Sequence, residues 1–493
     1  MKVLFYSVNN MWVPHFETEL ELLLNHKQQG DELFVLTCAG ALPTCVSNYD
    51  HLRTACMKCR LRFDGGMKIV GIDPRNIFYL KNYALPVTVP AVFNSWEQLM
   101  QWSWEGIDFG RMIASSLITH LRDHVIDVQQ HQQKIRDKLT SAFRAFFSTD
   151  EVIKCIKPDR VYIYNGRFCE VAAAVAACKH NGVEFTVHER GGTVDSYALF
   201  KNTTPHDIAY GKAVMKQLWE AADPTTSHPL AEQWFKDRRA GLEQSWLSFT
   251  AYQKKGLVPQ LFNHKTNIAI FNSSIDEYAA FPEWQNPLYA DELQALQAIF
   301  DAYKNDKSVH FYLRIHPHLK GFDNGQMKAL RALAQQGYSN VTFIWPAEVI
   351  DSYALLEKCD KAVVFGSTIG AEACFWGTPT VLIGRSFYED LDCCYIPTSR
   401  EHAIRLIEAN LLPKDPAHAL PYGYWEMNRG IPFRYFKPQG LFKGAFLGKE
   451  LKPQYSLKNK LLFKLYDRLD RYTLKRAKRR LVWRGDGVQE KVG

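Results

Sequence analysis

Short apolar runs of strand length alternate along the chain with longer segments in which apolar residues recur every three or four positions. In the first half, the order strand, helix, strand occurs twice, at 3–8, 16–24 and 32–37 and again at 159–165, 170–182 and 183–189. Long helical stretches between 95 and 147 separate the two units. Strands joined by helices predict a parallel sheet with helices on its faces.

The same pattern begins again after a polar helical region at 213–256. Expected strands and helices then alternate at 267–274, 290–303, 309–317, 326–336, 341–346, 352–359 and 361–366, followed by a helix after Ser367, a strand at 378–384 and a helix at 400–410. We expect a linker at 257–265, where proline and polar residues precede a new first strand. The fold class is therefore α/β, with two Rossmann-like doubly wound domains.

These patterns predict four parts of the chain. They are an N-terminal domain at 1–262, a C-terminal domain at 263–415, an extension at 416–457 that could cross back to the N-terminal domain, and a basic tail at 458–493.

Charge is concentrated in that tail. The chain has 493 residues and a formal net charge of +8. Between Lys458 and Arg484 there are eleven Lys and Arg residues but only two Asp, an excess of nine that accounts for the basicity of the whole chain. A nearly neutral body argues against a nucleic-acid-binding core.

The hydrophobic runs are too short for a membrane span of roughly 20 apolar residues. Met1 and Lys2 lead directly into a strand-like run rather than a signal peptide. We therefore expect a cytoplasmic protein.

The turn FGST at 365–368 follows the apolar run KAVVFG and precedes a helix-like segment. In a doubly wound sheet, ligands bind at the carboxyl ends of strands, near helix starts that favour anions. Gly366, Ser367, Thr368 and Glu372 are therefore candidate phosphate-site residues. The alternative is an ordinary strand-to-helix turn capped by a hydroxyl.

Two other strand ends in this half carry polar side chains. Arg314, His316 and Pro317 form RIHP at the end of one apolar strand, and Ser273 and Ser274 end another. Pocket residues commonly come from several strand ends of one sheet edge. These five residues therefore join the predicted ligand site, although a single histidine at such a position is often only a satisfied polar group.

The ordered set NSSIDE, RIHP, SYALLEKCD and VVFGSTIGAEACFWGTPTVLIG resembles the donor-binding domain of GT-B glycosyltransferases of bacterial surface-polysaccharide assembly, the capsule and lipopolysaccharide type. The resemblance covers about residues 265–390. It implies two domains facing a cleft, with a nucleotide-sugar donor held by the C-terminal half and a glycan acceptor by the N-terminal half.

Carried over by position, the resemblance places His316 and Pro317 against the donor phosphate, Ser367 and Thr368 in hydrogen bonds to phosphate, and Glu372 near the ribose. Similar HP turns favour a cytidylyl donor such as CMP-Kdo, CMP-sialic acid or CDP-glycerol. No DxD-like acidic pair stands in a matching place, so the resemblance implies a metal-independent mechanism with no cofactor for catalysis.

The N-terminal half supplies candidates for the acceptor side. An inverting transfer needs a general base, and His15, Glu17, Asp108 and Glu189 are candidates, Glu189 first, because it ends a strand beside a Gly pair. A structural ion pair between Glu189 and its neighbour is the alternative. Asn165, Arg167 and Arg190 are the predicted acceptor-binding residues.

Four cysteines, Cys38, Cys45, Cys56 and Cys59, form the spacing C-x6-C-x10-C-x2-C after the second predicted strand. Four thiolates so close in sequence could form a tetrahedral structural zinc site. Buried free thiols and a redox pair are the alternatives.

The tail places Leu462, Leu465, Leu469 and Tyr472 on one stripe of a helix, and basic residues surround it. Such a helix suits the anionic inner surface of the cytoplasmic membrane, where a lipid-linked glycan acceptor would be found, so the protein is expected to be peripheral there. The alternative is a helix that packs on the body.

The sequence thus predicts a glycosyltransferase of surface-polysaccharide assembly. Three alternatives stay open: a polyol-phosphate transferase that uses CDP-glycerol, a non-catalytic glycan-binding subunit, and a nucleotide-sugar hydrolase or epimerase.

Overall fold

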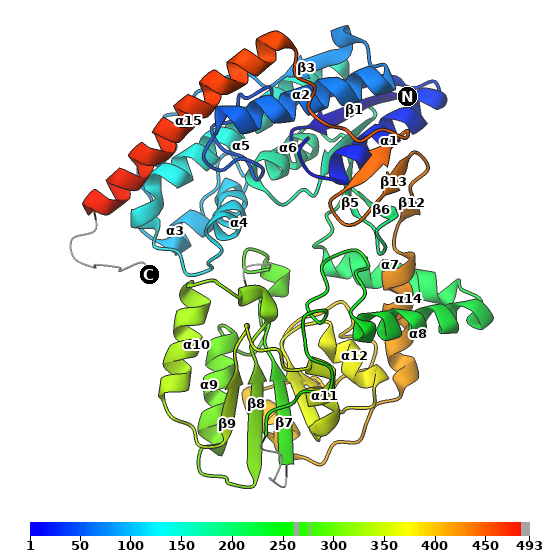
Figure 1. Cartoon of the computed structure of the whole chain (residues 1–493), viewed down its shortest axis with the longest axis vertical. Coiled ribbons are helices and arrows are strands. Elements are labelled where there is room, and N and C mark those ends of the chain that lie inside the picture. The colour runs from blue at the N-terminus through cyan, green and yellow to red at the C-terminus, as the bar shows by residue number, and fades with distance from the viewer. Residues whose placement is uncertain (261–265, 276–277, 485–493) are drawn as a thin grey trace.

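The computed structural model describes residues 1–260, 266–275 and 278–484. Two domains lie one above the other in Figure 1, each built on its own sheet. The expected boundary at 262 and the end of the expected tail, from 485 on, lie outside the described residues.

The N-terminal domain contains a seven-stranded sheet. Its order is β12 (Ile431–Pro432), β6 (Ser196–Lys201), β5 (Glu184–Arg190), β4 (Arg160–Tyr164), β1 (Lys2–Ser7), β2 (Glu32–Thr37) and β3 (Ile77–Tyr79). Strands β2, β1, β4 and β5 pair in parallel, as predicted, and β3, a strand that was not predicted, pairs in parallel with β2. Strands β6 and β12 add an antiparallel edge that the sequence pattern did not indicate.

Helices cover this sheet and form the upper domain of Figure 1. They are α1 (His15–Gln28), α2 (Arg53–Val70), α3 (Trp96–Met100), α4 (Phe109–Leu121), α5 (Gln132–Ile156) and α6 (Cys169–His180), with 3-10 turns at Pro74–Asn76 and Val128–His131. Strand β1 is fully buried from its second residue on because apolar clusters pack on both of its faces. This is why its sequence is almost continuously apolar.

The C-terminal domain has a five-stranded, fully parallel sheet. Its order is β11 (Thr380–Leu382), β10 (Lys361–Val364), β7 (Thr266–Phe271), β8 (Val309–Arg314) and β9 (Val341–Ile344). The helices are α9 (Glu292–Tyr303), α10 (Gly325–Gln335), α11 (Ser352–Lys358), α12 (Ile369–Phe375), α13 (Arg400–Glu408) and α14 (Leu420–Asn428), with 3-10 turns at Pro282–Trp284, Pro317–Leu319 and Pro416–Ala419. Every residue of β8 is buried.

The chain crosses between the domains twice. After β6 it enters α7 (Ile208–Glu220) and α8 (Pro224–Ala240), which pack with α14 in the C-terminal core although they precede residue 262. After α14 the chain returns, and β12 pairs with β6. The two crossings lie together, since the Gly192 N–H donates to the Arg429 carbonyl at 2.7 Å.

The returning segment completes the N-terminal domain. Strands β13 (Phe436–Pro438) and β14 (Gly444–Phe446) pair beside α1, whose Glu21 carboxylate accepts hydrogen bonds from the backbone N–H groups of Arg434, Tyr435 and Phe436. Helix α15 (Leu457–Arg484) then lies along α2 (Figure 1). No helix among the described residues is long and apolar enough to cross a membrane.

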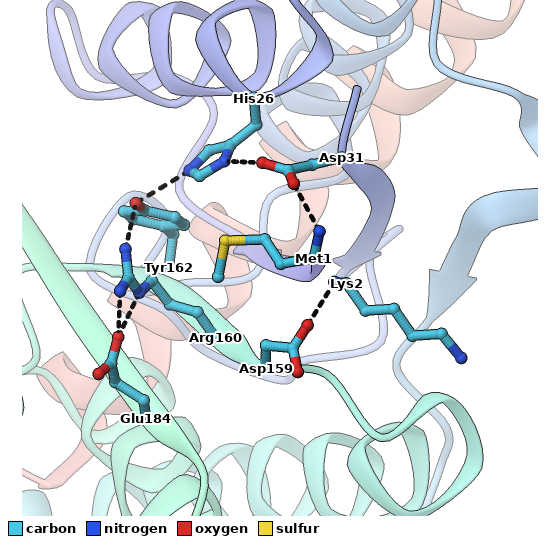
Figure 2. Close-up of polar contacts among 8 residues, drawn as sticks. All are labelled: Met1, Lys2, His26, Asp31, Asp159, Arg160, Tyr162 and Glu184. Carbon is cyan, nitrogen blue, oxygen red and sulfur yellow. Dashed lines mark hydrogen bonds and ion pairs between the residues drawn. The ribbon is translucent and has the colours of Figure 1, made fainter. Parts of the chain in front are cut away.

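A polar network ties the amino ends of the central strands together (Figure 2). His26 bonds to Asp31 at 2.7 Å and to the Tyr162 hydroxyl at 3.0 Å. Arg160 contacts the same hydroxyl and pairs with Glu184. On the next strand, the Lys2 N–H donates to Asp159 at 2.7 Å, and the Met1 amine donates to Asp31 at 2.6 Å. This network lies at the end of the sheet where the parallel strands begin, so it stabilises the fold and leaves the carboxyl ends for ligands.

Two Rossmann-like domains that face each other across a cavity form the GT-B arrangement, which confirms the predicted fold class.

Candidate functional site

A cavity of about 700 Å³ lies between the two domains. Most of its walls are the loops after strands of the C-terminal sheet, and the loop after β6 and helices of the N-terminal domain complete it. The lining includes Trp96, Ile118, His124, Phe200, His206, Arg238, Trp246, Phe249, Ser273, Ser274, Tyr278, Glu292, His316, Gly366, Ser367, Thr368, Arg385, Ser386, Glu426 and Arg429. The structure thus brings six of the nine predicted donor residues to one cavity.

The turn at 365–368 forms part of this wall. Gly366 has φ +123°, and a Cβ at this position would lie 2.4 Å from the Arg385 carbonyl oxygen, so only glycine fits. The Tyr388 hydroxyl donates to the Ser367 carbonyl. Thr368 makes no side-chain cap of α12 and instead donates to Glu372 at 2.8 Å. The Thr368 hydroxyl therefore does not cap α12, and the turn forms part of the cavity wall.

Glu372 does not line the cavity. It is buried behind the turn, where it accepts hydrogen bonds from Thr368 and from the Tyr353 hydroxyl, and its carboxylate lies 3.7 Å from Arg238. The prediction that Glu372 contacts the ribose is wrong, because Thr368, Tyr353 and Arg238 occupy its carboxylate and keep it away from the cavity. Glu372 orients Thr368 and Arg238 instead.

Arg238, from α8, is a cavity residue that sequence reasoning missed. Its Nη2 donates to Thr368 at 3.4 Å, and its guanidinium lies 5.7 Å from the centre of the Trp234 ring. Within the described chain, its buried Nε has no hydrogen-bond partner. Burial alone would lower the pKa of Arg238, but Glu372 and nearby tyrosines raise it, so the guanidinium is a fixed cation in the wall.

The RIHP segment divides between the site and the core. Arg314 is buried and donates to the Trp345 and Glu348 carbonyls at 2.8 and 3.1 Å, so it braces the loop after β9. Pro317 starts a 3-10 turn and does not line the cavity. Only His316 does, and its ring packs edge-on against Phe249 at 5.1 Å. The predicted donor roles of Arg314 and Pro317 are corrected for these reasons.

Ser273 and Ser274 reach the cavity at the end of β7. The Ser273 N–H donates to Glu292 at 3.0 Å, and burial raises the pKa of Glu292 to about 7. Glu292 stands in the first turn of α9, where acidic residues are common, so nothing in its sequence context distinguishes it.

On the N-terminal side, Glu189 at the end of β5 is the centre of a polar cluster. It lies 3.5 Å from His15 Nδ1, and it accepts hydrogen bonds from Asn165 at 2.7 Å and from the Arg190 N–H at 2.9 Å. Asn165, at φ +56°, is positioned by the turn after β4. The fold therefore brings together four residues that the sequence singled out, namely His15, Asn165, Glu189 and Arg190.

These contacts set the protonation states. Burial alone would raise the pKa of Glu189, but attraction to the protonated form of His15, the Asn165 hydrogen bond and Arg190 lower it below 4.5. Burial lowers the pKa of His15 to about 3, although Glu189 opposes this. At neutral pH the pair is a carboxylate beside a neutral imidazole, which is the state of a general base.

Two side chains of the cavity wall, Trp246 and His206, lie near the Glu189 cluster. Arg190 packs 5.5 Å from the centre of the Trp246 ring, which lines the cavity. His206 also lines it, and its pKa, lowered to about 3 mainly by burial, is influenced by the charges of Arg167 and Glu189. None of His15, Glu189 and Asn165 is itself part of the cavity wall.

The two predicted acceptor arginines are engaged within the protein. Arg190 donates to the Val13 carbonyl at 2.8 Å and lies between Trp246 and Phe442. Arg167 donates to Thr119 at 3.1 Å and packs 4.8 Å from the centre of Phe168. Both are positioned by these contacts.

The Gly pair after Glu189 also has a structural reason. A Cβ at Gly192 would lie 1.6 Å from the Glu426 carbonyl oxygen of α14. The backbone at Gly192 is therefore approached closely by another part of the chain itself, where it crosses between the domains.

Two acidic candidates are corrected. Asp108 is the N-cap of α4, accepts from the Arg111 N–H at 3.1 Å, and does not line the cavity. Glu17 is buried in an ion pair with Arg62. Neither is placed to take a proton from an acceptor.

All four cysteines of the predicted zinc site line one small cavity of about 40 Å³. Among the described residues, however, no group of three or more His, Cys, Asp or Glu side chains is arranged to hold a metal ion. Burial raises the pKa of all four thiols. Zinc at these cysteines stays a prediction that this arrangement does not favour.

Comparisons with known proteins give little beyond the fold. No protein-family model matches the sequence, and no curated protein matches it. Among solved structures, the chain is similar to KpsC of Thermosulfurimonas dismutans, a beta Kdo 2,4 transferase, with 13% identity, a TM-score of 0.35, and coverage of 63% of this chain and 88% of that one. A beta Kdo 2,7 transferase KpsC of the same organism has 12% identity, a TM-score of 0.34, and coverage of 66% and 94%.

The chain is also similar to a UDP-GlcNAc 2-epimerase from Neisseria meningitidis, with 13% identity, a TM-score of 0.27, and coverage of 88% of this chain and 96% of that one. At these identities and TM-scores, the function of this chain has to be argued from its own site.

Proposed function

We propose that this protein is a glycosyltransferase that moves a sugar from a nucleotide-sugar donor to a glycan acceptor in surface-polysaccharide assembly. The observation that carries the proposal is the cavity between the domains. Ser367, Thr368 and Arg238 line one wall, and the His15 and Glu189 pair lies behind the wall that the N-terminal domain forms. A donor on one side and a base on the other is the arrangement that transfer needs.

The donor's phosphates would lie against the turn at 366–368. As the nucleotide leaves, negative charge grows on its phosphate, and a fixed cation with neighbouring hydroxyl and amide groups stabilises that charge. Arg238 is suited to this role because Glu372 and Trp234 hold its guanidinium beside Thr368, and its buried Nε has no hydrogen-bond partner in the described part of the chain. His316 would bind at the other side of the phosphates.

The acceptor hydroxyl would lose its proton to Glu189. Its carboxylate is ionised at neutral pH, and Asn165 and the Arg190 N–H fix its orientation. Because Glu189 lies behind the cavity wall, we infer that Trp246 or His206 moves when the acceptor binds.

The finer assignment is a cytidylyl donor such as CMP-Kdo and a glycan or lipid-linked glycan acceptor, without a metal in catalysis. It rests on the sequence resemblance of RIHP and FGST. The alternative, transfer of a polyol phosphate from CDP-glycerol, would give a product of a different mass, so mass spectrometry of the product distinguishes the two reactions.

The deciding experiment is nucleotide binding by calorimetry with CMP, CDP, UDP, GDP and ADP. We expect a cytidine nucleotide to bind and Arg238→Gln to weaken it about tenfold or more, since a charge-assisted contact is lost. Arg239→Gln is the matched control, because Arg239 is adjacent to Arg238 in the sequence but pairs with Glu357 outside the cavity, so nucleotide binding should not change. Preference for UDP or GDP would reject the cytidylyl donor, and no binding of any nucleotide would reject the proposed function.

A further inference from the structure

Helix α15 has two faces of different character. One face packs on α2, and its half-buried or buried residues are Leu462, Phe463, Tyr466 and Asp470. The Phe463 ring contacts Lys58 and Tyr455, with centroid distances of 5.5 Å to each. This face fixes how the helix is oriented on the domain.

Asp470 is the main polar anchor of that face. Its carboxylate accepts hydrogen bonds from the backbone N–H groups of Arg53 and Thr54, at 3.0 and 2.9 Å, and from the Thr54 hydroxyl at 2.8 Å. It thereby caps the start of α2, whose own N-cap residue, Leu52, supplies no side-chain hydrogen bond. The anchor prevents the helix from rotating its other face inward.

The other face is an exposed apolar stripe. Its residues recur at steps of four and three, and their exposed fractions are 82% for Leu457, 70% for Leu461, 52% for Leu465, 40% for Leu469 and 66% for Tyr472. Contiguous exposed apolar surface of this kind is uncommon on a monomeric protein unless it meets a partner.

A basic stripe runs alongside it. It consists of exposed residues at steps of four and three, namely Lys460, Lys464, Arg468, Arg471 and Lys475. The stripe keeps a net positive charge, because Asp470 faces α2 and Asp467 neutralises only Arg471, with which it pairs at 2.7 Å. The exposed side of α15 therefore combines apolar side chains with positive charge.

We propose that α15 is a docking surface for an anionic lipid membrane, in which the apolar stripe enters the headgroup region and the basic stripe contacts lipid phosphates. The charge identifies the occupant, since a second copy of this helix would bring like charges together. Figure 1 shows α15 along the outer border of the N-terminal domain, where a flat surface can reach it. This inference does not depend on the proposed transfer reaction.

The test is co-sedimentation of the full chain with vesicles of phosphatidylcholine containing about 30% phosphatidylglycerol, and with vesicles of phosphatidylcholine alone. We expect binding to the anionic vesicles only, and loss of most of it at about 0.5 M salt, where charges are screened. Leu461→Ser with Leu465→Ser should reduce the partition coefficient about tenfold or more.

The control for the leucines is Leu412→Ser, which is 72% exposed on the other domain. Lys464→Glu with Arg468→Glu should weaken binding as well, whereas exposed Lys304→Glu with Lys328→Glu should not. All variants change exposed side chains, and their nucleotide binding and melting temperatures should match the wild type.

Two results would overturn the inference. One is the absence of wild-type binding to anionic vesicles, and the other is equal binding by the double leucine variant and its control. If light scattering instead found a dimer that the leucine variant dissociates, without vesicle binding, the stripe would be an interface between copies of the chain.

Discussion

Glu189 is the residue on which the proposed chemistry depends. Glu189→Gln keeps the size of the side chain and one of the two hydrogen bonds that the carboxylate accepts from Asn165 and the Arg190 N–H, since its amide has a single acceptor oxygen, and it removes the base. We expect transfer to fall by about 10²- to 10⁴-fold with unchanged nucleotide binding. Steady-state rates with the melting temperature as a check would measure this.

The pH dependence follows from the direction of the pKa shift. Because the pKa of Glu189 is lowered below 4.5, the carboxylate stays ionised as the pH falls to that value, and activity should be lost only below it. The control for Glu189→Gln is Asp108→Asn, which should leave the transfer rate unchanged. Asparagine caps a helix as well as aspartate does, and residue 108 lies outside the cavity. A Glu189→Gln enzyme within threefold of the wild type would remove the residue from the mechanism.

Ser367 and Thr368 are adjacent, and their variants should differ. Thr368→Ala removes a donor from buried Glu372, so the free energy of unfolding should fall by about 1 to 3 kcal/mol, together with weaker nucleotide binding. Ser367→Ala should weaken nucleotide binding and leave stability unchanged. Thermal unfolding and calorimetry on both variants separate the two roles; the same loss of stability in both would contradict this assignment.

At the scale of elements, the contact between α15 and α2 depends on one carboxylate. Asp470→Asn replaces a charged cap by a neutral one, and Asp470→Ala removes it, so docking should weaken by about 0.5 to 2 kcal/mol. Limited proteolysis would detect the released helix. Arg471→Ala, at an exposed neighbouring position, should leave the cleavage rate unchanged.

Acid should have the same effect as the substitution. Burial alone would raise the pKa of Asp470, but the Thr54 and Arg53 contacts lower it below 3.8. The stabilisation is therefore complete above 3.8 and is lost as the pH falls through the lowered pKa. An equally fast cleavage of wild type and Asp470→Ala at neutral pH would show that the apolar contacts alone hold the helix.

Periodicity predicted the parallel strands and most helices because these signals are local. It could not indicate that β12 pairs with β6 or that Asp470 caps α2, because the partners lie far apart in the sequence. The candidate site was also predictable only in part. The turns after strands can be recognised from the sequence, whereas Arg238 reaches the cavity from a polar helix whose sequence resembles that of any exposed helix. Arg314 looked functional because a strand end can be either a ligand site or a buried brace.

At the scale of the molecule, we infer that the cavity opens about the two chain crossings and that contacts on its other side, called the latch, hold it closed. The two chain crossings, near α7 and α14, lie on one side of Figure 1, and α10 meets the end of α4 on the other. There Asn324 donates to the Arg122 carbonyl at 2.7 Å and the Gly325 N–H donates to Asp123 at 2.9 Å. Opening therefore requires the second set of contacts to break while the crossings act as the pivot.

Asp123→Ala removes one of these latch contacts. A charge-assisted hydrogen bond contributes about 1.5 to 3 kcal/mol, so the open population should rise roughly tenfold or more. Small-angle scattering should show a larger radius of gyration. Asp127→Ala is the control, since this residue caps the nearby 3-10 turn within its own domain. An unchanged radius of gyration would mean that the remaining contacts, such as that of Asn324 with the Arg122 carbonyl, are enough to keep the cavity closed.

The return of the chain to its first domain has a consequence for biosynthesis. Arg53 starts α2, yet the carboxylate that caps this helix lies 417 residues further along. At about 5 to 20 residues per second, the ribosome needs about 20 to 80 s to supply it. During that time the C-terminal domain, which is continuous between the crossings, can fold while the edge strand β6 waits without its partner β12. The nascent chain thus exposes an open sheet edge for chaperones to cover, and the domain that is synthesised first is completed last.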